Sequence, residues 1–229
     1  AGQTMKPTVV IPTYNEAENL PGLVSALFSL QMPGLKVLVV DDASPDGTGD
    51  VAEDLAKTYR GRVAVIHRQG KLGLGSAYVN GFQRAIQAGA ESVVQMDADF
   101  SHPPEKLSEL LAALERYDLA MGSRYVKGGS LDTRWPAWRK GLSAFGNLYA
   151  RTILRLPVFD ATGGFRAWRR ETLLGMPLER IRSNGYAFQV EMAYVAHRLG
   201  FSITEIPFYF ADRKWGASKM SLAIQVEAA

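Results

Sequence analysis

The chain has 229 residues, of which 47% are hydrophobic and 21% charged, so we expect one large folded domain or two small ones. Its net charge of +3 is too mild to imply nucleic-acid binding, and we expect no nucleic-acid partner. The absence of cysteine excludes disulfides, thiolate zinc sites and cysteine nucleophiles, and it suits a reducing compartment.

The first half of the chain alternates short apolar runs with helical patterns. Strands are predicted over Thr8–Ile11, Val37–Val40, Val63–Ile66, Val93–Met96 and Leu119–Met121, and helices over Glu16–Leu30, Thr48–Tyr59, Ser76–Ala88 and Glu105–Arg116. Strands that alternate with helices of ten to fifteen residues predict parallel βαβ units, with helices on both faces of the sheet.

The second half is less regular. It predicts a loop over Gly128–Arg134, a helix over Trp138–Leu156, a strand over Gly163–Trp168, a helix over Ala187–Leu199 and a strand over Ser202–Phe210. No linker separates these elements from the first half, so we expect them to complete the same domain. Ser221–Ala229 begins a helical pattern without a capping signal, so a membrane segment beyond Ala229 stays an open alternative.

The most informative stretch is VVQMDADFSHPP, residues 93–104. Its apolar strand ends at Asp97 and Asp99, and ligands of open α/β sheets bind beyond the carboxyl ends of strands. Two carboxylates there predict a site for Mg²⁺ or Mn²⁺ that carries a phosphorylated substrate. The alternative is a solvated loop that holds two acids. The three histidines lack a metal-ligand spacing, and we expect His102 to be structural.

Two further strand ends carry polar side chains. Pro12-Thr13-Tyr14-Asn15-Glu16 follows the first strand, and Asp41-Asp42-Ala43-Ser44 follows the second. Carboxylates there can accept hydrogen bonds from a base or a ribose, and Tyr14 can pack against a base. Each motif alone is also ordinary turn chemistry. Three acidic strand ends in one parallel sheet favour a site.

The glycine-rich segment Gly70–Ser76 precedes a helix, as phosphate-binding loops do. It lacks the spacing of a P-loop and the full dinucleotide fingerprint. We therefore predict a tight strand-to-helix turn, with Lys71 as a candidate ligand contact.

Taken together, these motifs resemble those of the family 2 glycosyltransferases of the GT-A type, and most of all the polyprenyl (dolichyl) phosphate mannose synthases. The resemblance is carried by VVIPTYNEAENL, VLVVDDASPDGT, GKLGLGSAY, MDADFSHPPE, GSRY (122–125), DATGGFRAWRRE, SNGYAFQVEM and FADRKWGASKMS, which span nearly the whole chain. It implies one α/β domain of the GT-A (nucleotide-diphospho-sugar transferase) fold, with a Rossmann-like, mainly parallel sheet. Residues 5–125 would bind the nucleotide sugar, and residues 126–229 would bind the acceptor.

The resemblance also assigns residues. Pro12, Tyr14, Glu16, Val40 and Asp42 would surround the nucleoside; Asp97, Ala98 and Asp99 would hold the metal and diphosphate; Arg124, Arg213 and Lys219 would meet phosphates or sugar. Asp99, Arg124 and Arg213 would be the catalytic residues. Some family members use Gln as a metal ligand where this chain has Ser101, a weaker ligand that we prefer as a helix cap. Asn184, Tyr186, Gln189 and Glu191 are candidates to face the sugar.

The segment Trp138–Leu156 bears on the acceptor. Helical spacing places Trp138, Leu142, Phe145, Tyr149, Ile153 and Leu156 on one face, with Lys140, Arg151 and Arg155 roughly opposite. This face either packs on the core or lies on a membrane surface. Under both interpretations, the i, i+4 pair Arg139 and Ser143 forms candidate ligands for a lipid monophosphate.

The expected activity is therefore transfer of mannose from GDP-mannose to a polyprenyl (dolichyl) phosphate with inversion, dependent on Mg²⁺ or Mn²⁺, in a cytoplasmic protein peripheral at the cytoplasmic face of a membrane. Two alternatives stay open. One is the same chemistry with UDP-glucose or another nucleotide sugar, and the other is a nucleotide-binding module without catalysis.

Overall fold

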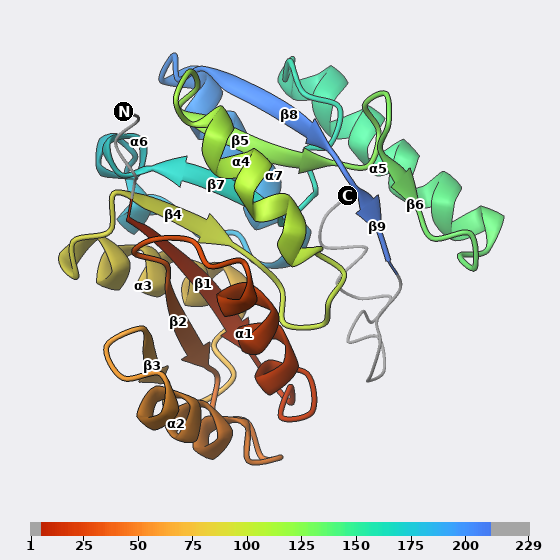
Figure 1. The fold of residues 1–229 in the computed structure, drawn as a ribbon. Coiled ribbons are helices and arrows are strands. Elements are labelled where there is room, and N and C mark those ends of the chain that lie inside the picture. The colour runs from red at the N-terminus through yellow and green to blue at the C-terminus, as the bar shows by residue number, and fades with distance from the viewer. Residues whose placement is uncertain (1–5, 212–229) are drawn as a thin grey trace.

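The computed structural model describes residues 6–211, which fold around a seven-stranded sheet (Figure 1). The order across the sheet is β3-β2-β1-β4-β7-β5-β8, and β6 pairs with β9 apart from it. β7 runs antiparallel to its neighbours β4 and β5, whereas the other pairs are parallel. The strands are β1 (Pro7–Thr13), β2 (Lys36–Asp41), β3 (Val63–His67), β4 (Ser92–Gln95), β5 (Leu119–Ser123), β6 (Ser130–Leu131), β7 (Arg166–Arg169), β8 (Ile203–Pro207) and β9 (Tyr209–Phe210).

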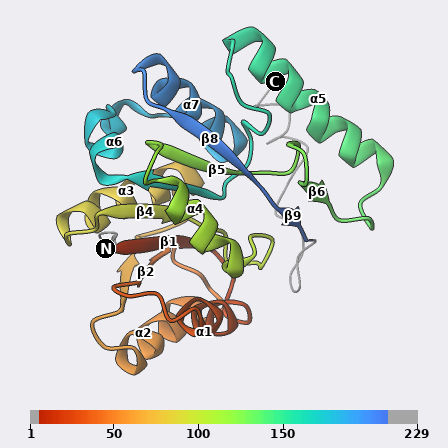
Figure 2. The same ribbon diagram turned by 45° about the horizontal axis from the view of Figure 1, so that its top comes forward.

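Helices cover both faces of the sheet. One face carries α1 (Leu20–Ser29), α2 (Thr48–Thr58) and α4 (Leu107–Ala113), and the other carries α3 (Leu74–Gln87), α6 (Arg170–Gly175) and α7 (Gly185–Arg198). Two 3₁₀ turns, Pro104–Lys106 and Leu178–Arg180, complete the described helical segments. Figures 1 and 2 show α5 (Ala137–Leu154) outside both layers, beyond the carboxyl ends of β5 and β8.

Alternation along the strands builds a core on each face. Val9 and Ile11 of β1 pack under α1 and α4, whereas Val10 packs under α3, because successive strand residues point to opposite faces. Gly81 brings α3 against β1: a Cβ at this position would clash with Cγ1 of Val10, so a side chain does not fit there. The predicted mainly parallel α/β sheet with helices on both faces is confirmed.

The first helix begins later than predicted, at Leu20 and not at Glu16. Asn15 adopts a left-handed φ of 57°, which stops the helix from extending back toward β1. The N–H groups of residues 15–17 instead donate to side-chain oxygens of the loop after β2, on Ser44, Thr48 and Asp46. Contacts between loops have therefore overridden the local helical pattern.

Several later boundaries also differ from the prediction. The helix expected over 105–116 begins as a 3₁₀ turn and ends at Ala113; the loop over 128–134 contains β6; the strand expected from Gly163 begins at Arg166; the strand over 202–210 divides into β8 and β9; and α6 was not predicted. These elements are two to six residues long or broken, so they are too short to show a period in the sequence.

The apolar face of α5 does not pack on the core. Its large side chains are exposed, from 46% for Tyr149 to 68% for Trp138, and Asn147 is the buried residue of the helix. The core-facing interpretation of this face is therefore wrong. Leu156, expected on the same face, lies just beyond the helix and is buried.

Candidate active site

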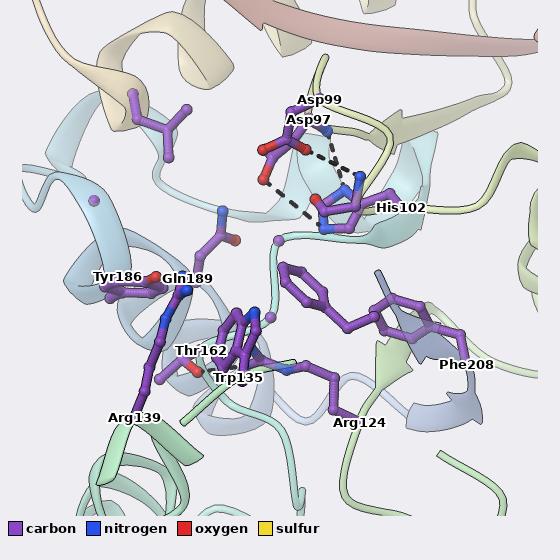
Figure 3. Close-up of a pocket in the computed structure, with 16 residues that line it drawn as sticks. Asp97, Asp99, His102, Arg124, Trp135, Arg139, Thr162, Tyr186, Gln189 and Phe208 are labelled. Carbon is purple, nitrogen blue, oxygen red and sulfur yellow. Dashed lines mark hydrogen bonds and ion pairs between the residues drawn. The ribbon is translucent and has the colours of Figure 1, made fainter. Parts of the chain in front are cut away.

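A pocket opens at the carboxyl ends of β4 and β5, between α7 and the start of α5 (Figure 3). β7 lies between β4 and β5 and runs antiparallel to both, so the residues just before β7 lie at the same edge of the sheet as the carboxyl ends of β4 and β5. The loop before α5 also reaches this edge. The pocket is lined by Leu74, Asp97, Asp99, Ser101, His102, Arg124, Trp135, Arg139, Thr162, Gly163, Gly164, Gly185, Tyr186, Gln189, Phe208 and Phe210. Seven of the residues expected at the site thus meet here: Asp97, Asp99, Ser101, Arg124, Arg139, Tyr186 and Gln189.

Two carboxylates, Asp97 and Asp99, line one end of this pocket (Figure 3). The side chain of Asp97 is 38% exposed and accepts a hydrogen bond from the Tyr78 hydroxyl at 3.1 Å. Asp99 is buried, and its Oδ1 accepts the backbone N–H of Ser101 at 3.0 Å. Burial raises the pKa of Tyr78 well above its usual value, so this hydroxyl stays protonated and donates to Asp97.

His102 supports the loop that carries both carboxylates. Its Nδ1 accepts the backbone N–H of Asp97 at 3.0 Å, so in the neutral ring Nε2 carries the proton and faces Oδ2 of Asp97 at 3.9 Å. Burial lowers the pKa of His102, which favours that neutral ring. The ring also stacks on Phe165 at 5.0 Å between centroids. The structure thus gives His102 the structural role that we expected.

The donor set fits a hard divalent cation. Asp97 and Asp99 offer carboxylate oxygens in one pocket, as Mg²⁺ and Mn²⁺ prefer. Within residues 6–211 no cluster of three or more acidic, histidine or cysteine side chains forms a closed site, so substrate and water oxygens would complete the shell. The preferred capping role of Ser101 is wrong: the 3₁₀ turn starts after Pro103, the N-cap of α4 is Lys106, and neither end has a side-chain cap.

Arg124 is held by a carboxylate of its own chain. Nε and Nη2 donate to the two oxygens of Asp160 at 2.7 Å each, and Nη2 also meets Thr162. Both ion-pair partners are buried. Burial lowers the pKa of Arg124, but the charge and hydrogen bonds of the Asp160 carboxylate outweigh that effect and raise the pKa above its ordinary value, so the guanidinium stays charged. Asp160 thus fixes Arg124 in the pocket wall, a pairing that the sequence motif containing it did not reveal.

The two expected acceptor ligands separate in the structure. Arg139 lines the pocket, and its guanidinium lies 3.6 Å from the ring centre of Trp135. Ser143, one turn further along α5, accepts the Tyr125 hydroxyl at 2.7 Å and is not among the residues that line the pocket. The structure therefore brings Arg139, but not Ser143, to the carboxylates.

The residues expected around the nucleoside gather at the ends of β1 and β2, adjacent to this pocket in the sheet but not in its lining. Asp42 is buried: Oδ1 accepts from Arg68 at 2.6 Å, and Oδ2 accepts the N–H groups of Leu72 and Gly73 at 3.1 Å. The glycine-rich segment is thus a tight turn before α3, as predicted. Lys71 of that turn lies 4.3 Å from the ring centre of Tyr14. Pro12 and Glu16 are half-buried, and Val40 belongs to the core.

Two predicted site residues, Arg213 and Lys219, lie outside the described residues. Trp135 and Thr162 also line the pocket, although the sequence analysis named neither of them as a site residue. The only signal for Trp135 in the sequence was its position directly before Pro136, the N-cap residue of α5. Tyr186 and Gln189, expected near the sugar, do line the pocket, whereas Asn184 and Glu191 do not.

Gln189 is oriented by a buried chain of hydrogen bonds. The indole N–H of Trp168 donates to Oε1 of Gln95 at 2.7 Å, and Nε2 of Gln95 donates to Oε1 of Gln189 at 3.2 Å. Because an indole nitrogen can only donate, this order fixes both amides and turns the Nε2 of Gln189 toward the pocket. A Cβ on Gly164 would lie 3.3 Å from that Nε2 and 3.8 Å from Oδ1 of Asp97, so glycine keeps this space open.

Comparisons with known proteins agree with this architecture. The chain is 47% identical over 95% of its length to a polyprenol monophosphomannose synthase of Mycolicibacterium smegmatis, of which it covers 83%. It is also 47% identical over 98% of its length to an undecaprenyl-phosphate mannosyltransferase of Micrococcus luteus, of which it covers 91%.

Solved structures share the fold at lower identity. Glucosyl-3-phosphoglycerate synthase from Mycobacterium tuberculosis, in complex with Mn²⁺, UDP and glucosyl-3-phosphoglycerate, is 18% identical with a TM-score of 0.72, covering 98% of this chain and 77% of that one. A mannosyltransferase from Pyrobaculum calidifontis, in complex with GDP-Man and Mn²⁺, is 21% identical with a TM-score of 0.60, covering 90% and 55%. The family model described as glycosyl transferase family 2 matches residues 8–174, and the chain belongs to this family.

Proposed function

We propose that this protein transfers mannose from GDP-mannose to a polyprenyl (dolichyl) monophosphate, giving polyprenyl phosphate β-mannose and GDP. The observation that carries the proposal is a single pocket with carboxylates at one end, Asp97 and Asp99, and the Arg139 guanidinium at the other. The helix that supplies Arg139 exposes an apolar face, as a lipid acceptor needs. The names of the two relatives at 47% identity support this sugar and this acceptor.

The proposed reaction is one in-line displacement. An oxygen of the acceptor phosphate attacks the anomeric carbon of mannose, the bond from that carbon to the diphosphate oxygen breaks, and GDP leaves with the electron pair. The attack inverts the anomeric centre. The acceptor is already an anion near neutral pH, so the protein has no proton to remove and no general base is required.

The residues of the chain position the two anions. Asp97 and Asp99 would hold Mg²⁺ or Mn²⁺, which when bound offsets the negative charge of the diphosphate. Arg124, fixed by Asp160, and Arg139 provide positive charge at the other end of the pocket. Arg213 and Lys219 remain candidates for the diphosphate. In this proposal residues 5–125 serve the donor and residues 126–229 the acceptor, with Arg124 at the boundary.

The activity is tested by incubating the protein with GDP-mannose, Mn²⁺ and a short polyprenyl phosphate, and measuring GDP release and the mannosylated lipid. Release that depends on the lipid supports transfer. GDP-mannose hydrolysis at the same rate without lipid would contradict the proposed acceptor, and binding without any turnover would favour a non-catalytic nucleotide-binding module.

The choice of nucleotide is a separate prediction. We expect GDP to bind at least about tenfold more tightly than UDP in the presence of Mn²⁺, measured by isothermal titration. Sites that pair buried hydrogen-bonding groups of a ligand can discriminate by ~10⁴-fold, whereas a loose pocket cannot. Equal affinities, or a preference for UDP, would favour the alternative in which UDP-glucose is the donor.

We further propose that α5 lies on a membrane surface. Trp138, Leu142, Phe145, Leu148, Tyr149 and Ile153 of α5 are each 46–68% exposed, while Arg139 at its start reaches the pocket. No helix within residues 6–211 is long and apolar enough to cross a bilayer. An amphipathic helix with an aromatic face and flanking cations is typical of interfacial binding, which would present the lipid phosphate to Arg139.

Phe145→Glu should therefore weaken binding to vesicles that contain anionic lipids by about tenfold or more, because full burial of such a side chain contributes about 1.5–3 kcal/mol. GDP affinity should stay unchanged, since Phe145 is not among the residues that line the pocket. Leu174→Glu is the matched control, because Leu174 of α6 is similarly exposed, at 60% against 63% for Phe145. Equal vesicle binding of the two variants would reject this face as the membrane surface.

A further inference from the structure

The pocket contains a buried hydrogen-bond donor without a protein acceptor. Trp135 is 7% exposed, and its indole Nε1 makes no hydrogen bond within the described part of the chain. In Figure 3 this nitrogen lies on the edge of the ring that faces the interior of the pocket. Buried polar groups are nearly always paired in native proteins, so an unpaired donor in a ligand pocket calls for a partner on the ligand.

The ring of Trp135 is held in place on several sides. Its backbone N–H donates to the carbonyl of Asp132 at 3.2 Å, and Pro136 follows as the N-cap of α5. The Phe210 ring meets it edge-on, with centroids 5.6 Å apart, and the Arg139 guanidinium stacks on it at 3.6 Å. The indole N–H is therefore aimed by the fold, and a ligand meets it without first ordering the side chain.

The surroundings identify the chemistry of the partner. At this end of the pocket lie the cations Arg139 and Arg124, whereas the carboxylates Asp97 and Asp99 occupy the other end. A dianionic phosphate is attracted to the first end and repelled from the second. An indole nitrogen can only donate, so its partner must be an acceptor atom such as a phosphate oxygen.

We propose that the Trp135 indole N–H donates a hydrogen bond to an oxygen of the acceptor phosphate, and that Trp135 and Arg139 together form the acceptor-phosphate subsite. This inference rests on the proposed function for the identity of the acceptor. Trp135 has two tasks in it: its N–H contacts the phosphate, and its ring face orients the guanidinium that shares that phosphate. Ser143 accepts the Tyr125 hydroxyl and does not line the pocket, so it is not part of this subsite.

The test is the Trp135→Phe variant, which removes the N–H and keeps an aromatic face for Arg139. The probe is farnesyl monophosphate, titrated calorimetrically into the GDP- and Mn²⁺-bound protein. Loss of a hydrogen bond to a charged group should weaken its binding about 10- to 100-fold, with GDP affinity unchanged. Tyr117→Phe is the matched control, because it removes the polar hydrogen of an exposed aromatic side chain that does not line the pocket.

Thermal unfolding with and without farnesyl monophosphate gives a second reading. The rise in midpoint temperature caused by the ligand should be smaller in Trp135→Phe than in wild type, whereas a purely structural role of the ring would lower both midpoints of the variant and leave that rise unchanged. In the ¹⁵N-labelled wild-type protein, the indole N–H resonance of Trp135 should move downfield when farnesyl monophosphate is added, a measurement that does not depend on the variant folding.

The outcomes separate this inference from the proposed function. Equal farnesyl phosphate affinity in Trp135→Phe and wild type would overturn the subsite, and so would an equal ligand-induced rise in midpoint temperature in the two proteins. Loss of GDP affinity would place Trp135 in the donor site, against the inference. If farnesyl phosphate binds more weakly to Trp135→Phe than to wild type, but the wild-type protein transfers no mannose, the subsite is supported and the proposed function is contradicted.

Discussion

Asp99→Asn is expected to abolish metal-dependent nucleotide binding while the protein stays folded. The amide has the size of the carboxylate and can still accept the N–H of Ser101 through its oxygen, so the loop after β4 should keep its shape. It lacks the negative charge that a divalent cation needs in this pocket. Substitution of groups that merely orient metal ligands typically costs 10–100-fold, and loss of a direct ligand should exceed about 100-fold in turnover.

The measurement is GDP titration with and without Mn²⁺, alongside mannose transfer. In wild type, chelation of the metal should reduce GDP affinity, and in Asp99→Asn the addition of Mn²⁺ should make no difference. Glu115→Gln, which removes an exposed carboxylate away from the pocket, should behave as wild type. An unchanged Mn²⁺-dependent affinity in Asp99→Asn would show that Asp99 is not a ligand and would leave Asp97 as the candidate.

The two carboxylates could be predicted from the sequence because their position depends only on local pattern and topology. An apolar strand followed by Asp97 and Asp99 places both at a carboxyl edge wherever the strand lies in the sheet. The same holds for Asp42, which directly follows β2. Its hydrogen bonds to Arg68 and to the turn before α3 were not predictable, because they join residues 26 to 31 positions apart in the sequence.

The contacts at the cationic end of the pocket could not be predicted from the sequence. Arg124 was found by resemblance, but its bidentate pairing with Asp160 depends on the antiparallel β7 between β4 and β5. The hydrophobic pattern of a four-residue strand does not indicate whether the strand is parallel or antiparallel to its neighbours. Trp135 was missed because a lone tryptophan before a helix is usually a packing residue. Its significance comes from the unpaired indole nitrogen, which is visible only in the folded structure.

The helix α5 shows a third kind of limit. Its amphipathic period was readable, but a period does not say whether the apolar face meets a core or a membrane. The arrangement of the helices shows that this face does not meet the core. α1, α2 and α4 cover one face of the sheet and α3, α6 and α7 cover the other, so α5 lies outside both layers. The same arrangement carries Arg139 on the side of α5 that reaches the pocket.

Arg139→Ala is expected to lower acceptor-dependent turnover by about 30-fold or more, while GDP-mannose affinity stays near that of wild type. Truncating one partner of a desolvated charge pair typically costs about 2–5 kcal/mol, and here the other partner would be the acceptor phosphate. The loss should also affect orientation, because a misplaced attacking oxygen reacts more slowly even when it is bound. Arg180→Ala, which removes an exposed cation outside the pocket lining, is the control.

Arg139→Lys distinguishes charge from geometry. Lysine keeps the positive charge but replaces a planar fork by a point charge, which cannot clasp a phosphate through two parallel N–H bonds or stack flat on Trp135 as the guanidinium does at 3.6 Å. We therefore expect acceptor use between those of wild type and Arg139→Ala. Acceptor-dependent kinetics in detergent or bicelles, with GDP-mannose titration of each variant, check this order. If Arg139→Ala loses donor affinity and keeps its acceptor KM, Arg139 belongs to the nucleotide site, and the acceptor phosphate must bind elsewhere.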